Sequence, residues 1–102
     1  MVYIIQDDGS KNFAPAMKYG DLDTLVTHDY PKFNIEGGKD AITKMKTKLQ
    51  SYDPTVDYLL LTGDPIWIGI CMTILFSGNT TTIMCLKWDK QTKQYLPITI
   101  NL

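Results

Sequence analysis

The sequence predicts an α/β fold: one small domain over residues 1–102, with a mixed sheet of four or five strands, two helices and a C-terminal β-hairpin. Strand-like runs alternate with two helical segments, a pattern typical of parallel strands joined by helices. A polar loop between the last two strand-like runs predicts the hairpin. The 102 residues suit a single domain, and 44% of them are hydrophobic, which is enough for a core.

The first strand is predicted at residues 2–5, a run of β-branched and aromatic side chains. It is followed by Asp7, Asp8, Gly9 and Ser10, a sequence typical of a turn. Residues 11–33 carry no clear periodicity, although apolar positions predict a short strand near 22–27.

A helix is predicted over residues 39–52, where Ile42, Met45, Leu49 and Tyr52 form one apolar stripe. Two glycines before the helix and Asp-Pro after it predict its ends. The helix also carries several lysines outside the stripe. We interpret them as a solvated face, with a basic strip for an acidic partner or a phosphate as the alternative.

The second strand and helix follow one another over residues 57–77. Residues 57–62 lack alternation, which predicts a strand buried on both faces, as in a parallel sheet. Asp64 suits the N-cap of the next helix and Pro65 its first position. Because residues 66–76 are apolar around nearly the whole circumference, we expect this helix to be buried on every side.

The chain ends in two predicted strands, residues 80–88 and 94–102, joined by five polar residues. The first strand, the 57–62 strand and the 80–88 strand should run parallel, and the last strand antiparallel to its neighbour. Pro97 lacks a backbone donor, which predicts an edge position for the last strand.

Candidate ligand-binding residues lie where the two predicted parallel strands end. Ligands of open α/β sheets bind beyond the carboxyl ends of the strands, and these ends carry Asp7 and Asp8, then Gly63 and Asp64. If the two strands are neighbours, three carboxylates converge, and such oxygens could hold Mg²⁺. The alternative is structural: a turn at Asp7 and Asp8, and a helix cap at Asp64.

Other classes of site find little support in the composition. The net charge of −1 argues against a dedicated nucleic-acid binder. Cys71 and Cys85 lie in apolar runs, which favours free thiols in a reducing compartment. One histidine, His28, and two cysteines cannot build a zinc site, so no metal site, cofactor or catalytic residue is assigned. Trp67 and Trp88 are predicted to be core residues.

No membrane segment is expected, because the longest apolar stretch, residues 65–76, is too short to cross a bilayer. The N-terminal residues also lack the pattern of a signal peptide.

Several segments resemble short proteins of tailed bacteriophages, many of them from marine and cyanobacterial phages. The similar stretches are Asp57 to Pro65, Ile68-Gly69, Leu86 to Asp89, and Tyr95 with Pro97-Ile98, together with residues 2–7 and 15–20. The resemblance covers most of the chain and implies a phage gene product in the host cytoplasm or in a virion. It implies no catalytic residues.

We therefore expect a small phage accessory protein that acts by binding a host or phage protein rather than by catalysis. One alternative is a small ligand-binding or Mg-dependent enzyme using the carboxylates named above, and another is a virion structural component. We also expect a homodimer, because two helices and residues 11–37 offer too little apolar cover for the sheet and the second helix.

Overall fold

The computed structural model describes residues 1–27 and 35–102, so that His28 lies outside the described residues. Its elements follow one another in the order β1 (Val2–Gln6), η1 (Ala14–Tyr19), β2 (Leu22–Val26), α1 (Ile35–Leu49), β3 (Tyr58–Leu60), α2 (Pro65–Phe76), β4 (Thr82–Asp89) and β5 (Gln94–Asn101). The η1 segment is a 3₁₀ helix. The predicted α/β class is confirmed.

The strands form one five-stranded sheet in the order β2-β1-β3-β4-β5. β1 pairs in parallel with β2 and β3, and β3 pairs in parallel with β4. β4 and β5 form the predicted antiparallel hairpin. β2 lies where the apolar positions near 22–27 predict a short strand. β1 and β3 are neighbours, which is the condition that the sequence left open.

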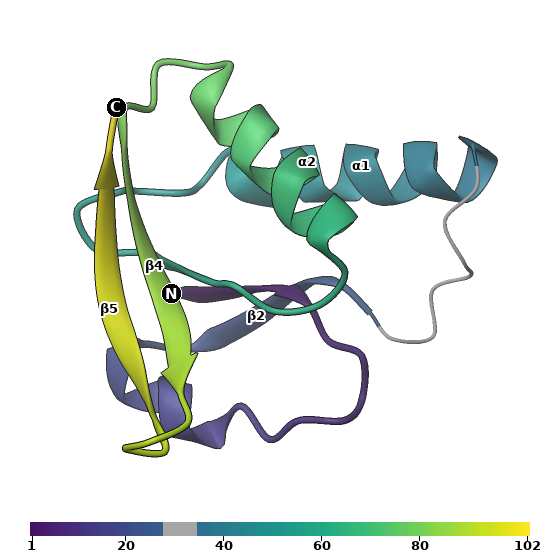
Figure 1. Cartoon of the computed structure of the whole chain (residues 1–102). Helices are drawn as coiled ribbons and strands as arrows, with labels where there is room; N and C mark the ends of the chain where they lie inside the picture. The colour runs from purple at the N-terminus through teal and green to yellow at the C-terminus, as the bar shows by residue number, and fades with distance from the viewer. Residues whose placement is uncertain (28–34) are drawn as a thin grey trace.

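Each face of the sheet has its own hydrophobic core. Both helices lie on one face, where α1 and α2 pack beside each other (Figure 1). The core under them includes Ile5, Met45, Leu59, Ile83 and Cys85. On the other face η1 and the residue before it cover a smaller core of Val2, Ile4, Phe13, Ala16, Leu60, Leu86 and Tyr95. The stretch without periodicity therefore supplies the second layer.

The prediction that the 66–76 helix is buried on every side is wrong. Only Trp67, Cys71 and Leu75 of α2 are buried, and the Ile66 side chain is 50% exposed. The physical reason is that both helices share one face of the sheet, so that the side of α2 turned away from the strands has no cover within the described residues. An apolar composition shows that a helix has apolar sides, but not which of them are covered.

The predicted bounds of the first helix are also corrected. α1 begins at Ile35 and continues through Gly37 and Gly38, the residues expected to precede it. It ends at Leu49, so that Tyr52 lies beyond it, although its hydroxyl still accepts a hydrogen bond from the Met84 amide at 3.2 Å. Packing of Ala41, Met45 and Leu49 against the sheet outweighs the low helix propensity of glycine.

β5 is an edge strand, as Pro97 predicts. The Tyr19 hydroxyl donates a hydrogen bond to the Tyr95 carbonyl at 3.1 Å, which occupies an acceptor of this strand. Both features reduce the number of free backbone groups to which another strand could pair. Within the described residues, no helix is long and apolar enough to cross a membrane.

Candidate functional site

The main candidate site is a pocket at the carboxyl ends of the parallel strands. β1 and β3 are neighbours in the sheet. The chain continues from β1 to β2 on one side of this pair, and from β3 to β4 on the other side. Such a reversal of direction leaves a crevice between the two central strands, the usual ligand position in open α/β sheets. The pocket lies beside this crevice, over the ends of β3 and β4, and has a volume of about 510 Å³, within the range of small-molecule sites.

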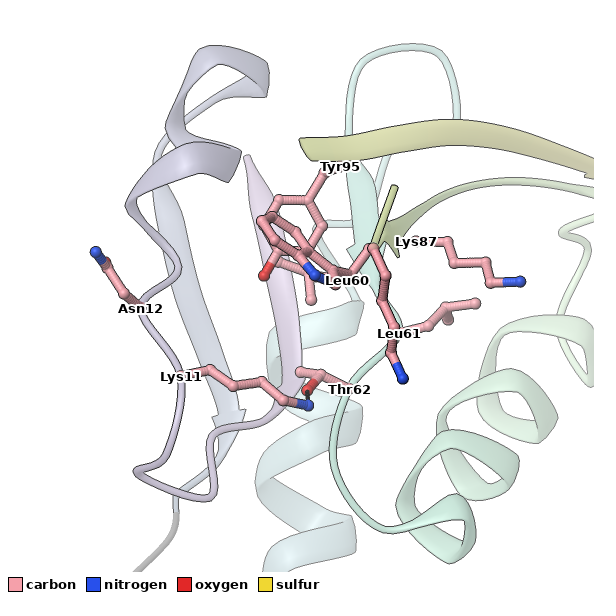
Figure 2. Close-up of a pocket in the computed structure, with 9 residues that line it drawn as sticks. Lys11, Asn12, Leu60, Leu61, Thr62, Lys87 and Tyr95 are labelled. Carbon is pink, nitrogen blue, oxygen red and sulfur yellow. Dashed lines mark hydrogen bonds between the residues drawn. The ribbon is translucent and has the colours of Figure 1, made fainter. Parts of the chain in front are cut away.

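Three segments far apart in the sequence build the pocket. The stretch between β1 and η1 supplies Lys11 and Asn12, and the end of β3 supplies Leu60 with the two residues after it. The β4–β5 hairpin supplies the remaining lining residues. Figure 2 shows Lys11 reaching toward Thr62, while Leu60, Leu61, Lys87 and Tyr95 line other parts of the pocket. The full lining is Lys11, Asn12, Leu60, Leu61, Thr62, Lys87, Trp88, Lys90 and Tyr95.

The charged groups that line this pocket are all lysines: Lys11, Lys87 and Lys90. The Lys11 ammonium donates a hydrogen bond to the Thr62 hydroxyl at 2.9 Å, which holds the end of its side chain inside the pocket. Asp89 lies between the other two lysines in the sequence, but its carboxylate accepts hydrogen bonds from the amide and hydroxyl of Thr92. These hydrogen bonds lower the pKa of Asp89, so it stays an anion committed to the hairpin turn.

An aromatic pair forms the apolar wall. Trp88 of β4 lies opposite Tyr95 of β5, and their rings pack edge to face with centroids 4.9 Å apart. Tyr95 is buried, whereas Trp88 is 41% exposed. The prediction of two core tryptophans is therefore confirmed for Trp67, which is 4% exposed, and wrong for Trp88. β4 extends beyond the end of β3, so its last residues have no neighbouring strand on that side to cover them.

The sequence-predicted residues lie near this edge but do not line the pocket. The carboxylate of Asp7 accepts a hydrogen bond from the Gly9 amide, and that of Asp8 accepts from the amide of Ser10 and its hydroxyl. The bonds from Ser10 lower the pKa of Asp8. Asp64 caps α2 by accepting a hydrogen bond from the Ile66 amide at 2.9 Å. The turn and the cap are thus confirmed, and a ligand-binding role for these residues stays a prediction.

Gly63 lies in the turn after β3 and packs closely against Gln6, the last residue of β1. Its φ of +99° lies in the region that favours glycine, and a Cβ added here would lie 2.3 Å from Cβ of Gln6. The amide of the next residue, Asp64, donates a hydrogen bond to the Gln6 side-chain oxygen at 2.7 Å. Gly63 therefore has a structural task, which is to let β1 approach the turn that precedes α2.

Metal and thiol chemistry find no support in the geometry. In the part of the chain that the structure describes, no three His, Cys, Asp or Glu side chains come together as a metal site. Burial raises the pKa of Cys71 to about 12 and that of Cys85 to about 11. Since the thiolate is the reactive form, both cysteines act as core residues and not as nucleophiles.

Sequence reasoning missed all three lysines of the pocket. Lys11 lies just after the turn of Asp7 to Ser10, while Lys87 and Lys90 lie at the end of β4 and in the hairpin loop. The signal available was positional: each of them follows or ends a predicted parallel strand on its carboxyl side. Only the strand order shows that they meet.

The family model of the Phage Pam3 gp32-like protein matches residues 1–102. The chain belongs to this family. The match covers the whole sequence and confirms the resemblance to short proteins of tailed bacteriophages, so this is a phage protein of the Pam3 gp32-like family. No curated protein and no solved structure matches the chain.

Proposed function

We propose that this Pam3 gp32-like protein is a phage accessory protein that acts by binding a small anionic ligand in the pocket at the carboxyl ends of β1, β3 and β4. The observation that carries the proposal is the lining of the pocket of about 510 Å³, which contains three lysines and no carboxylate. The nearby carboxylates of Asp8 and Asp89 interact with the charges of Lys11 and Lys87, but they lie outside the lining and accept hydrogen bonds from Ser10 and Thr92. The chain as a whole has a net charge of −1, so these cations are concentrated locally.

The contacts of Lys11 support an anion as the ligand. Its ammonium has one hydrogen bond to the Thr62 hydroxyl and no salt bridge among those formed by the described residues. An ammonium has three donors, so Lys11 has donors left for ligand oxygens. The Asn12 amide and the Thr62 hydroxyl line the same pocket as further polar groups.

The same lining favours binding over catalysis. A general acid or base must lie within hydrogen-bonding reach of the reacting group and have a pKa near the working pH. Among the lining residues there is no histidine, cysteine or carboxylate, and burial raises the pKa of the Tyr95 hydroxyl further above neutral pH. We therefore propose a non-enzymatic role in which the bound anion, and not a reaction, is the functional event, with the host cytoplasm as the place where it occurs.

Inorganic pyrophosphate is the probe for this proposal. Calorimetric titration should detect one site per chain at low ionic strength, because all three ammonium groups attract the anion. The affinity should fall by about tenfold between about 0.01 M and 0.1 M salt, as the Debye length shrinks from about 30 Å to about 10 Å. Absence of binding at low salt would contradict the proposal, and so would an affinity that does not respond to salt.

A second candidate function, protein binding, has an observation of its own, the outer side of α2. A groove between α1 and α2 is lined by Ile42, Pro65, Ile66, Ile70 and Ile74, with Lys46 as its one charged lining residue. Gly69 also lines it, and a Cβ there would meet nothing within 4 Å. Ile66, Ile70 and Ile74 form a ridge on α2 and Gly69 a gap beside it, so a second copy of this chain offers a matching surface.

The second candidate predicts a homodimer formed through this groove. Light scattering coupled to size exclusion at micromolar concentration should give a mass near twice the 11.6 kDa of the chain. Ile66→Lys should return the mass to that of one chain without unfolding it, because the side chain is half-exposed. A wild-type mass of one chain would reject the dimer and leave a host or phage protein as the occupant to test.

A further inference from the structure

We infer that the ligand of the pocket is a free nucleotide, whose phosphates bind the lysines and whose base stacks on Trp88. This inference rests on the proposed anion site and adds the chemical class of the ligand. It starts from a feature that anion binding leaves unexplained, namely a half-exposed tryptophan in the wall of a cationic pocket.

Trp88 is held in place without being covered. Its ring packs edge to face on Tyr95 at a centroid distance of 4.9 Å, and Tyr95 is itself anchored in the smaller core with 4% exposure. Edge-to-face packing uses one ring's edge and the other ring's face, so the indole keeps surface available to a ligand. An aromatic ring positioned in this way is the usual platform on which nucleic-acid bases stack.

The charged and apolar lining residues divide between two parts of one ligand. Lys11, Asn12 and Thr62 come from the two loops at the carboxyl ends of β1 and β3, where phosphates lie in open α/β sheets. The hairpin supplies Trp88 and Tyr95 together with Lys87 and Lys90, and Leu60 and Leu61 extend the apolar surface. A nucleotide combines the matching features, anionic phosphates for the lysines and a flat apolar base for the indole ring of Trp88.

A free nucleotide fits better than a nucleic-acid strand. Proteins that bind single strands combine a basic groove along the backbone with several aromatic platforms for successive bases. The pocket has one exposed aromatic ring, and the chain has a net charge of −1. The volume of about 510 Å³ also suits one small ligand.

The experiment compares adenosine diphosphate (ADP) with inorganic pyrophosphate, because the two share the diphosphate and differ by the nucleoside. Calorimetry on the wild-type chain should show ADP binding about tenfold more tightly than pyrophosphate, the effect of one stacked base. Trp88 fluorescence should be quenched by ADP and little changed by pyrophosphate. The second tryptophan, Trp67, is buried and serves as an internal reference.

Trp88→Leu should remove the advantage of ADP, so that ADP and pyrophosphate bind this variant with equal affinity, while Trp88→Phe should retain part of the advantage because it keeps a ring. Circular dichroism checks that both variants are folded. Equal affinities of ADP and pyrophosphate in the wild type would overturn the nucleotide inference and leave the anion site standing. Binding of neither compound would overturn both. Tighter binding of a short oligothymidylate than of ADP would overturn the free nucleotide in favour of a single strand.

Discussion

Gly63→Ala is expected to lower the free energy of unfolding by about 2–4 kcal/mol, a large part of the 5–15 kcal/mol typical of a small domain. Two causes add. The backbone φ of +99° strains any residue with a Cβ, and the new methyl group would lie 2.3 Å from Cβ of Gln6. Relief would require β1 and the turn after β3 to separate, which would break the hydrogen bond from the Asp64 amide to Gln6.

Urea denaturation followed by circular dichroism measures this loss. Gly78→Ala is the matched control, since its φ is not positive and a Cβ there would meet the Leu75 carbonyl oxygen at an ordinary 3.6 Å. The control should change the free energy of unfolding by no more than about 0.5 kcal/mol. If the two variants are equally stable, Gly63 does not hold the two strand ends together as described.

The sheet was predictable because its central strands are buried on both faces. Residues 58–60 of β3 form a continuous apolar run, and the turn of Asp7 to Ser10 closes β1 clearly. Pro97 marked the edge strand by the donor it lacks. These are local features of the chain, and no knowledge of distant contacts is needed to interpret them.

The errors arise where tertiary contacts decide. The two glycines at the start of α1 were interpreted as the end of a loop, yet the helix passes through them because the rest of it packs on the sheet. Ala14–Tyr19 has no apolar periodicity but covers the second face of the sheet. α2 was expected to be surrounded, and its exposed side follows from the placement of both helices on one face.

The candidate site was only partly predictable. The sequence predicts a ligand at the carboxyl ends of the parallel strands, and the pocket lies at this edge of the sheet, over the ends of β3 and β4. Its lysines could not be chosen from the ten in the chain, because Lys11 and Lys90 are far apart in sequence and meet through the strand order. The exposure of Trp88 depends on how far β4 extends past β3, which composition does not specify.

The combined substitution of Lys11, Lys87 and Lys90 by Gln should weaken pyrophosphate binding by about a hundredfold or more. Each ammonium contributes a charge-assisted hydrogen bond or a close charge to the anion, and losing such contacts costs on the order of 1 kcal/mol each. Every 1.4 kcal/mol corresponds to a tenfold change in affinity. Stability should change little, because all three side chains are exposed at the surface.

A matched variant separates the pocket from overall charge. Replacing Lys39, Lys44 and Lys46 by Gln removes the same three charges from exposed positions on α1, outside the pocket lining. Because it lowers the net charge equally, its affinity for pyrophosphate should fall by only about twofold, the effect of distant, screened charges.

The most direct test of an anion site at this edge is therefore a calorimetric titration of pyrophosphate into the wild-type chain and these two triple variants at low salt. The wild type should bind clearly, the variant without the three lysines outside the pocket should bind nearly as well, and the variant without Lys11, Lys87 and Lys90 should lose binding. Equal affinities of the two variants would contradict an anion site at this edge of the sheet.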